Sequence, residues 1–203
     1  MERRRTNAVL TLTRCAALSA LAVALYAVEI PVVAFYRLDL STLPAILAGF
    51  AMGPAQGLAV VAVKNLVRMP VSDSVCVGEL ADMLMSGAFV AVAGFLYARD
   101  RTRRGAYRAL AAGTAAMTAA GILTNYFVLI PAYQALLGMS AQSILAIGAA
   151  VHPWIDSMEK LAVCVAGPFN LLKGGVLSAV TAGIYKRVSP LLRAARTTER
   201  KPM

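Results

Sequence analysis

Apolar residues run almost without interruption through six segments of the chain, and short polar or basic segments separate them. The six segments cover residues 8–34, 43–52, 55–67, 80–98, 109–130 and 157–185. Several exceed the roughly 18 apolar residues that suggest a transmembrane helix. The second and third are short, and Gly53 and Pro54, a pair that ends a continuous helix, stand between them. The pattern predicts one all-α membrane domain, residues 1–203, with six transmembrane helices and a basic tail at 186–203.

Composition agrees with a membrane protein. Of the 203 residues, 59% are hydrophobic and 15% are charged, and the mean hydropathy is +0.68. These values lie far from the averages of soluble domains. The sequence therefore predicts a multi-pass protein embedded in the lipid bilayer.

Basic residues gather at the N-terminus, after the fourth segment and at the C-terminus. The positive-inside rule places all three clusters in the cytoplasm, and an even number of predicted crossings separates each cluster from the next. Both termini are therefore expected in the cytoplasm. Arg37 and Arg68 are exceptions, because they fall in connections that this topology places outside. Topology and anionic lipid headgroups account for the net charge of +10 without nucleic acid.

Polar residues inside the apolar segments are the candidates for a binding site. A charged side chain within a membrane usually faces a protein interior or a water-filled cavity. Asn170 and Lys173 lie three residues apart and so share one face of a helix. Glu79 and Asn125 occupy similar positions in other segments. These four residues are expected to form a polar wall, with a buried Lys173–Glu79 ion pair as the structural alternative.

Other polar residues have simpler explanations. Lys64 and Asn65 are expected to reach the membrane interface near the end of the third segment. A single histidine and three scattered cysteines indicate neither a metal site nor a disulfide. The chain has no phosphate-binding glycine loop, so energy for transport would have to come from a partner. We expect no catalytic residue, no metal and no cofactor.

Two long segments, NYFVLIPAY (125–133) and PFNLLKG (168–174), closely resemble signature segments of the riboflavin-specific S-components of energy-coupling factor (ECF) transporters. The shorter segments LDLSTLP (38–44), GP (53–54), KNL (64–66) and GELA (78–81) follow in the same order as in that family. Asp82 is a departure, because the family often has Asn there. The resemblance implies a six-helix substrate-binding subunit in a bacterial cell membrane, without enzymatic activity, that captures riboflavin from outside.

The resemblance also implies which residues bind the vitamin. Polar contacts are expected from Glu79, Asn125, Asn170 and Lys173, and backbone contacts from the loop residues Leu38, Asp39 and Leu40. An Asn offers both a donor and an acceptor, which suits the mixed edge of the riboflavin ring. The apolar ring face is expected to lie against Tyr36, Leu38, Phe127 or Tyr133. The alternative for each aromatic residue is a place at the membrane interface.

Small residues predict a second surface. Ala16, Ala20 and Ala24 recur at every fourth position of the first segment, a spacing that allows close helix approach in lipid. Packing within the domain is the alternative. In the family that the chain resembles, such a face docks a transmembrane coupling subunit, the T-component, which in turn sits on two cytoplasmic ATPases.

Other functions fit the same residues. One is an S-component for thiamine, biotin or pantothenate, in which Lys173 would balance the charge of an anionic vitamin. Another is a small intramembrane enzyme that acts on lipid through Glu79, Asp82 and Lys173. The arginine distribution places both carboxylates outside, which argues against that enzyme. A membrane scaffold would leave the polar wall unexplained.

Overall fold

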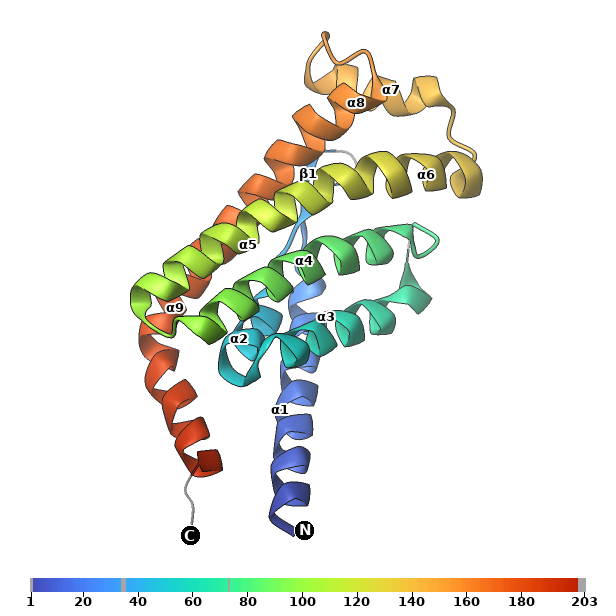
Figure 1. Ribbon diagram of the computed structural model, residues 1–203. Coiled ribbons are helices and arrows are strands. Elements are labelled where there is room, and N and C mark those ends of the chain that lie inside the picture. The colour runs from blue at the N-terminus through green and yellow to red at the C-terminus, as the bar shows by residue number, and fades with distance from the viewer. Residues whose placement is uncertain (1, 34–35, 73, 201–203) are drawn as a thin grey trace.

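The computed structural model describes residues 2–33, 36–72 and 74–200, which form a helical bundle with one short β-hairpin (Figure 1). The helices are α1 Glu2–Tyr26, α2 Leu43–Met52, α3 Pro54–Arg68, α4 Val77–Arg99, α5 Arg103–Thr124, α6 Ile130–Leu137, α7 Ala141–Val151, α8 Met158–Leu161 and α9 Gly167–Arg200. The π-helical turns Asn125–Leu129 and Ala162–Ala166 join α5 to α6 and α8 to α9. The start of α1 and the end of α9 lie at the same end of the bundle (Figure 1).

Within the described residues, four helical stretches are long and apolar enough to cross a membrane. They are Ala8–Tyr26, Val77–Arg99, Arg103–Leu137 and Met158–Tyr185. The other two predicted spans are helices, but α2 has 10 residues and α3 has 15. At 1.5 Å per residue, each is shorter than a hydrocarbon core of about 30 Å. The four long apolar helices confirm the prediction of a helical membrane domain.

The first predicted segment is not one helix, because α1 ends at Tyr26 rather than at residue 34. Ile30–Val33 (β1) pairs in antiparallel fashion with Tyr36–Leu38 (β2), and Pro31 lies opposite Arg37. Proline removes a backbone donor and clashes with the preceding helical turn, while the β-branched residues around it favour extended backbone. Apolar character continued past Tyr26, but helical structure did not.

The predicted connection at 131–156 also contains helices. The fifth predicted span continues through α6 to Leu137, and α7 follows after a short break. Gly138 ends α6 with a φ of +64°, a left-handed conformation that glycine adopts without strain. The Ser140 side chain then accepts a hydrogen bond from the Ser143 N–H at the start of α7. The predicted basic tail at 186–203 begins within α9, which runs on to Arg200.

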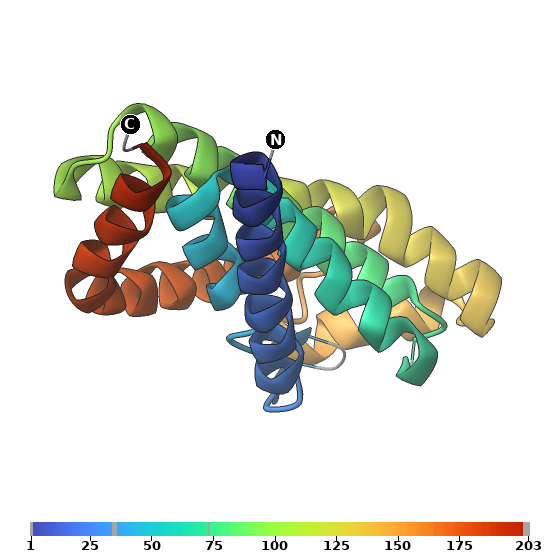
Figure 2. The ribbon, with the colours of Figure 1, turned by 90° about the horizontal axis from the view of Figure 1, so that it is seen from below.

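Close helix packing in the bundle depends on a glycine between α2 and α3. A Cβ on Gly57 would lie 2.8 Å from the carbonyl oxygen of Ala45 and 2.6 Å from the Val90 side chain. Only a residue without a side chain lets α3 approach α2 and α4 this closely. Figure 2 shows α1 crossing this α2–α3 pair. The packed helices bring buried residues of α3, α4 and α9 together around the site.

Candidate functional site

A cavity of about 290 Å³ lies between the β-hairpin, the starts of α4 and α9, and the junction of α5 with α6. Its volume is near the lower end of the range for small-molecule sites. The structure brings six of the predicted site residues to its wall: Tyr36, Asp39, Glu79, Asn125, Tyr133 and Lys173. Four others, Leu38, Leu40, Phe127 and Asn170, do not line it.

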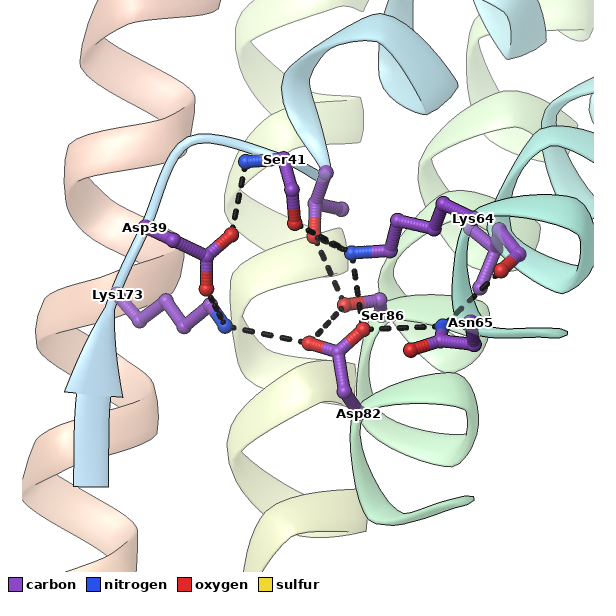
Figure 3. A network of polar contacts seen from close by, with 9 residues as sticks. Asp39, Ser41, Lys64, Asn65, Asp82, Ser86 and Lys173 are labelled. Atoms are coloured by element: carbon purple, nitrogen blue, oxygen red, sulfur yellow. Dashed lines mark hydrogen bonds and ion pairs between the residues drawn. The ribbon is translucent and has the colours of Figure 1, made fainter. Parts of the chain in front are cut away.

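Two lysines and two aspartates form a buried network on one side of this cavity (Figure 3). Lys173 Nζ of α9 lies 2.8 Å from Asp39 Oδ2 and 3.2 Å from Asp82 Oδ1. Lys64 Nζ of α3 lies 2.9 Å from Asp82 Oδ2 of α4. Since two positive and two negative charges are present, the network has no net charge. Pairing of this kind is what makes buried charges tolerable.

Lys64 belongs to this network, so the prediction that it reaches the membrane interface is wrong. Its side chain is fully buried, and Nζ also donates to Ser41 Oγ at 2.6 Å and to Thr42 Oγ1 at 3.2 Å. Val60 and Lys64 lie four residues apart on the face of α3 that is buried in the bundle. The side chain therefore extends into the protein and anchors the loop that leads into α2.

Asp82 is the centre of the network. Besides the two lysines, Asn65 Nδ2 donates to Asp82 Oδ2 at 3.1 Å, and Ser86 Oγ donates to Asp82 Oδ1 at 3.1 Å. A neutral amide here, as the resembling family often has, would leave the lysines in excess by one charge. Sequence reasoning left the role of Asp82 open. Its position inside an apolar segment, three residues after Glu79, was the available signal.

The alternative of a Lys173–Glu79 ion pair is wrong. Lys173 pairs with Asp39 and Asp82 instead. Glu79 accepts a hydrogen bond from Ser72 Oγ at 2.5 Å, and its side chain lines the cavity. The carboxylate is therefore held in place by a hydroxyl and keeps further acceptor capacity.

The resemblance implied only a backbone contact from Asp39, but its side-chain carboxylate also makes contacts within the protein. It accepts hydrogen bonds from the Ser41 N–H at 2.8 Å and from Lys173. Burial raises the pKa of Asp39, but the nearby ammonium groups of Lys173 and Lys64 outweigh burial and hold this pKa below its ordinary value. The loop between β2 and α2 is thus fixed by an ion pair with α9 and by hydrogen bonds from Lys64 of α3.

Aromatic residues and an amide form another side of the cavity. The Tyr36 hydroxyl donates to Asn125 Oδ1 at 2.7 Å, and Asn125 Nδ2 donates to the Gly121 carbonyl at 2.8 Å. The Tyr36 and Phe169 rings have centroids 4.9 Å apart. Phe169 was not predicted for the site, although it adjoins Asn170 in the 168–174 segment. These side chains give an apolar aromatic surface, with its two rings tilted by 42°, beside a hydrogen-bonding amide.

The aromatic and amide residues that do not line the cavity have clear local reasons. Phe127 is 66% exposed on the outer face. Asn125 and Leu129, four residues apart, face inward, so Phe127 midway between them faces outward. Asn170 is fully buried beside Gly121, and its Nδ2 donates to the Ala166 carbonyl at 2.9 Å. Its Oδ1 has no hydrogen-bond partner among the described residues. Asn170 therefore lies at the contact between α9 and α5 rather than in the cavity wall.

The alanine row on α1 is open to contact. Ala16, Ala20 and Ala24 are all exposed, whereas Ser19 and Ala22 on the same helix are buried. The alanine row is therefore not buried by packing within the described part of the chain.

Helices of membrane-spanning length and a cavity with both charged and aromatic walls define a membrane-embedded solute-binding protein. Comparison with known proteins agrees with this class. The family model for the substrate-specific component of ECF transporters matches residues 10–185. The chain therefore belongs to the family of ECF transporter substrate-specific components.

Similar proteins come from bacteria. The riboflavin transporter FmnP of Bacillus subtilis (strain 168) is 33% identical over 168 residues, which cover 80% of this chain and 82% of FmnP. The riboflavin transporter RibU of Staphylococcus aureus (strain TCH60) is 30% identical over 182 residues, covering 87% of this chain and 88% of RibU. A solved S component of a bacterial ECF transporter has 31% identity and a TM-score of 0.72, over 90% of this chain and 96% of that one. The protein is thus a multi-pass bacterial membrane protein from a family of transporter components rather than enzymes.

Proposed function

We propose that this chain is the riboflavin-binding subunit of an ECF importer. The observation that carries the proposal is the network beside the cavity, in which each buried lysine is already balanced by an aspartate. A neutral ligand would leave this network intact, whereas anionic pantothenate or biotin would compete with Asp39 and Asp82 for Lys173. The names of the two bacterial relatives support riboflavin as that neutral ligand.

The ligand would meet both kinds of wall. We propose that the flavin ring packs against Tyr36, Tyr133 and Phe169, which line the cavity. Asn125 and Glu79 would bond to the polar edge or the hydroxyls. The Lys173 ammonium has three donors and uses two on carboxylates, which leaves one for the ligand. Asn170, Leu38 and Leu40 would act indirectly, by supporting this wall and the loop.

The same proposal covers topology and partners. Six crossings, with α2 and α3 among them and both termini in the cytoplasm, agree with the three basic clusters and with the shared end of α1 and α9 (Figure 1). The exposed row of Ala16, Ala20 and Ala24 would dock a T-component that carries two ATPases. Ala20→Leu should block this assembly, because a larger side chain prevents close helix approach, and should leave flavin affinity unchanged. Co-purification and flavin titration would measure the two effects separately.

Flavin titration of the purified, detergent-solubilised protein tests the function directly. The fluorescence of riboflavin should be quenched in a saturable way, with a stoichiometry of one flavin per chain. Lys173→Ala should weaken binding by more than the ~1 kcal/mol of a neutral hydrogen bond, because a charged donor is lost. Lys160→Ala is the matched control, because Lys160 pairs with Asp156 outside the cavity. A folded protein that neither carries nor quenches flavin would refute the proposal, and the other vitamins would then be the ligands to test.

A further inference from the structure

Arg68 is a cation that the charge distribution along the chain does not explain. Like Arg37, it lies in a connection that the basic clusters place outside the cell. Arg37 forms an ion pair with Glu29. Arg68 has no ion pair within the described ranges, and its Nε is buried without a hydrogen-bond partner. Both arginines line the cavity, but only Arg37 has a carboxylate to account for its place there.

Tyr26 at the end of α1 holds the Arg68 guanidinium in place. The Arg68 Cζ lies 4.3 Å from the centroid of the Tyr26 ring, and both residues line the cavity. A guanidinium stacked on an aromatic face keeps its N–H donors in a fixed plane. Because Arg68 lines the cavity, its guanidinium can donate to an acceptor that a ligand brings there.

The chemistry of that acceptor follows from Glu79, which lines the same cavity. Arginine can only donate hydrogen bonds, and an ionised carboxylate can only accept them. A hydroxyl does both, so a polyol chain can accept from Arg68 and donate to Glu79. A phosphate would be attracted by Arg68 but repelled by Glu79. The pair therefore fits a neutral polyol better than an anionic chain.

We infer that Arg68 is a specificity-determining residue, which donates from the α1–α3 side of the cavity to the polyol chain of the bound ligand. The inference rests on the proposed function, because riboflavin brings such a chain together with its ring. It assigns the two halves of the ligand to different walls. The ring would lie on the aromatic wall, and the chain would extend toward Arg68.

Riboflavin and lumiflavin, which has the same ring system but no polyol chain, separate this role from a structural one. Arg68→Met should weaken riboflavin binding by about tenfold or more, as expected for losing a charged hydrogen bond. Lumiflavin binding, measured by displacement, should change by less than about twofold. Arg99→Met is the matched control, because the Arg99 Cζ also lies 4.3 Å from an aromatic centroid, that of Phe95, outside the cavity.

Equal weakening of both flavins in Arg68→Met, or unchanged riboflavin affinity, would overturn the inference. Thermal unfolding of the ligand-free variant checks that it is folded, and Arg68→Gln replaces it if the methionine variant is not. Failure of the proposed function gives a different result, since the unmodified protein would then not bind riboflavin at all.

Discussion

The two ends of α4 bury their polar groups in opposite ways. Near its start, Asp82 is surrounded by charged and polar side chains from α3, from α9 and from α4 itself. Near its end, about 22 Å further along the helix, the Tyr97 hydroxyl lies 2.8 Å from that of Tyr185, and the Tyr97 ring stacks on Phe50 at 4.1 Å. The first arrangement depends on a balance of charges, whereas the second joins two neutral hydroxyls beside a stacked aromatic ring.

This difference determines how each end responds to a change. Removing one member of a charged network leaves its partners buried and uncompensated. Removing one member of a neutral pair costs about one hydrogen bond. The end that carries the cavity is therefore the sensitive one, and it is also the end at which a ligand would meet the protein.

Asp82→Asn should have the largest effect. The substitution keeps the shape of the side chain but removes its negative charge. Two lysines, Lys64 and Lys173, then share one carboxylate in the network, that of Asp39. Breaking a buried pair typically costs about 3–5 kcal/mol. Thermal unfolding of the ligand-free protein in detergent would measure this loss.

A double variant distinguishes charge imbalance from lost contacts. Lys64→Met added to Asp82→Asn restores one positive and one negative charge, Lys173 and Asp39. The double variant should therefore be more stable than Asp82→Asn alone. If the two losses simply add, charge balance does not explain the sensitivity of this end.

Tyr97→Phe tests the neutral end and should have a much smaller effect. It removes one hydroxyl and keeps the ring stacked on Phe50, so the expected cost is about 1 kcal/mol. Tyr185→Phe removes the other hydroxyl of the same pair and should cost a similar amount, and the double variant should cost little more than either. Flavin affinity should not change in any of the three. A loss of affinity would show that the two ends are coupled.

The sequence predicted the strongly apolar helices well, because long apolar segments leave little choice in a membrane. It failed where local chemistry overrides hydropathy, as at Pro31, which lies in β1 rather than in a helix. It also failed where tertiary packing determines which residue pairs with a buried charge. Lys64 lies beside Asp82 only because Gly57 lets α3 approach α4, and nothing in the order of residues specifies that distance. Glu79 and Asn125 were found because they are polar residues at the ends of apolar segments, and the resemblance then assigned them to the site, whereas Arg68 was marked only as a misplaced cation.

The smallest effect is expected from moderate acidification. Lys173 and Lys64 hold the Asp39 pKa below its ordinary value of 3.8, so Asp39 carries its charge in the folded protein at least down to that pH. A depressed carboxylate pKa contributes stability above the unfolded-state pKa, and this contribution is lost as the pH falls through the folded-state pKa. The stability difference between the unmodified protein and Asp39→Asn should therefore be constant from about pH 8 to about pH 5 and shrink only near and below 3.8.

Parallel thermal unfolding of both proteins across this range gives the comparison, and the difference cancels other titrating groups. The same difference for Tyr97→Phe should be flat throughout, because it removes only a hydroxyl from the neutral pair. A difference for Asp39→Asn that already shrinks between about pH 7 and about pH 5 would mean that Asp39 takes up its proton too early for a lysine-paired carboxylate. The ionic description of the loop before α2 would then be wrong, and the contrast between the two ends of α4 would lose its physical basis.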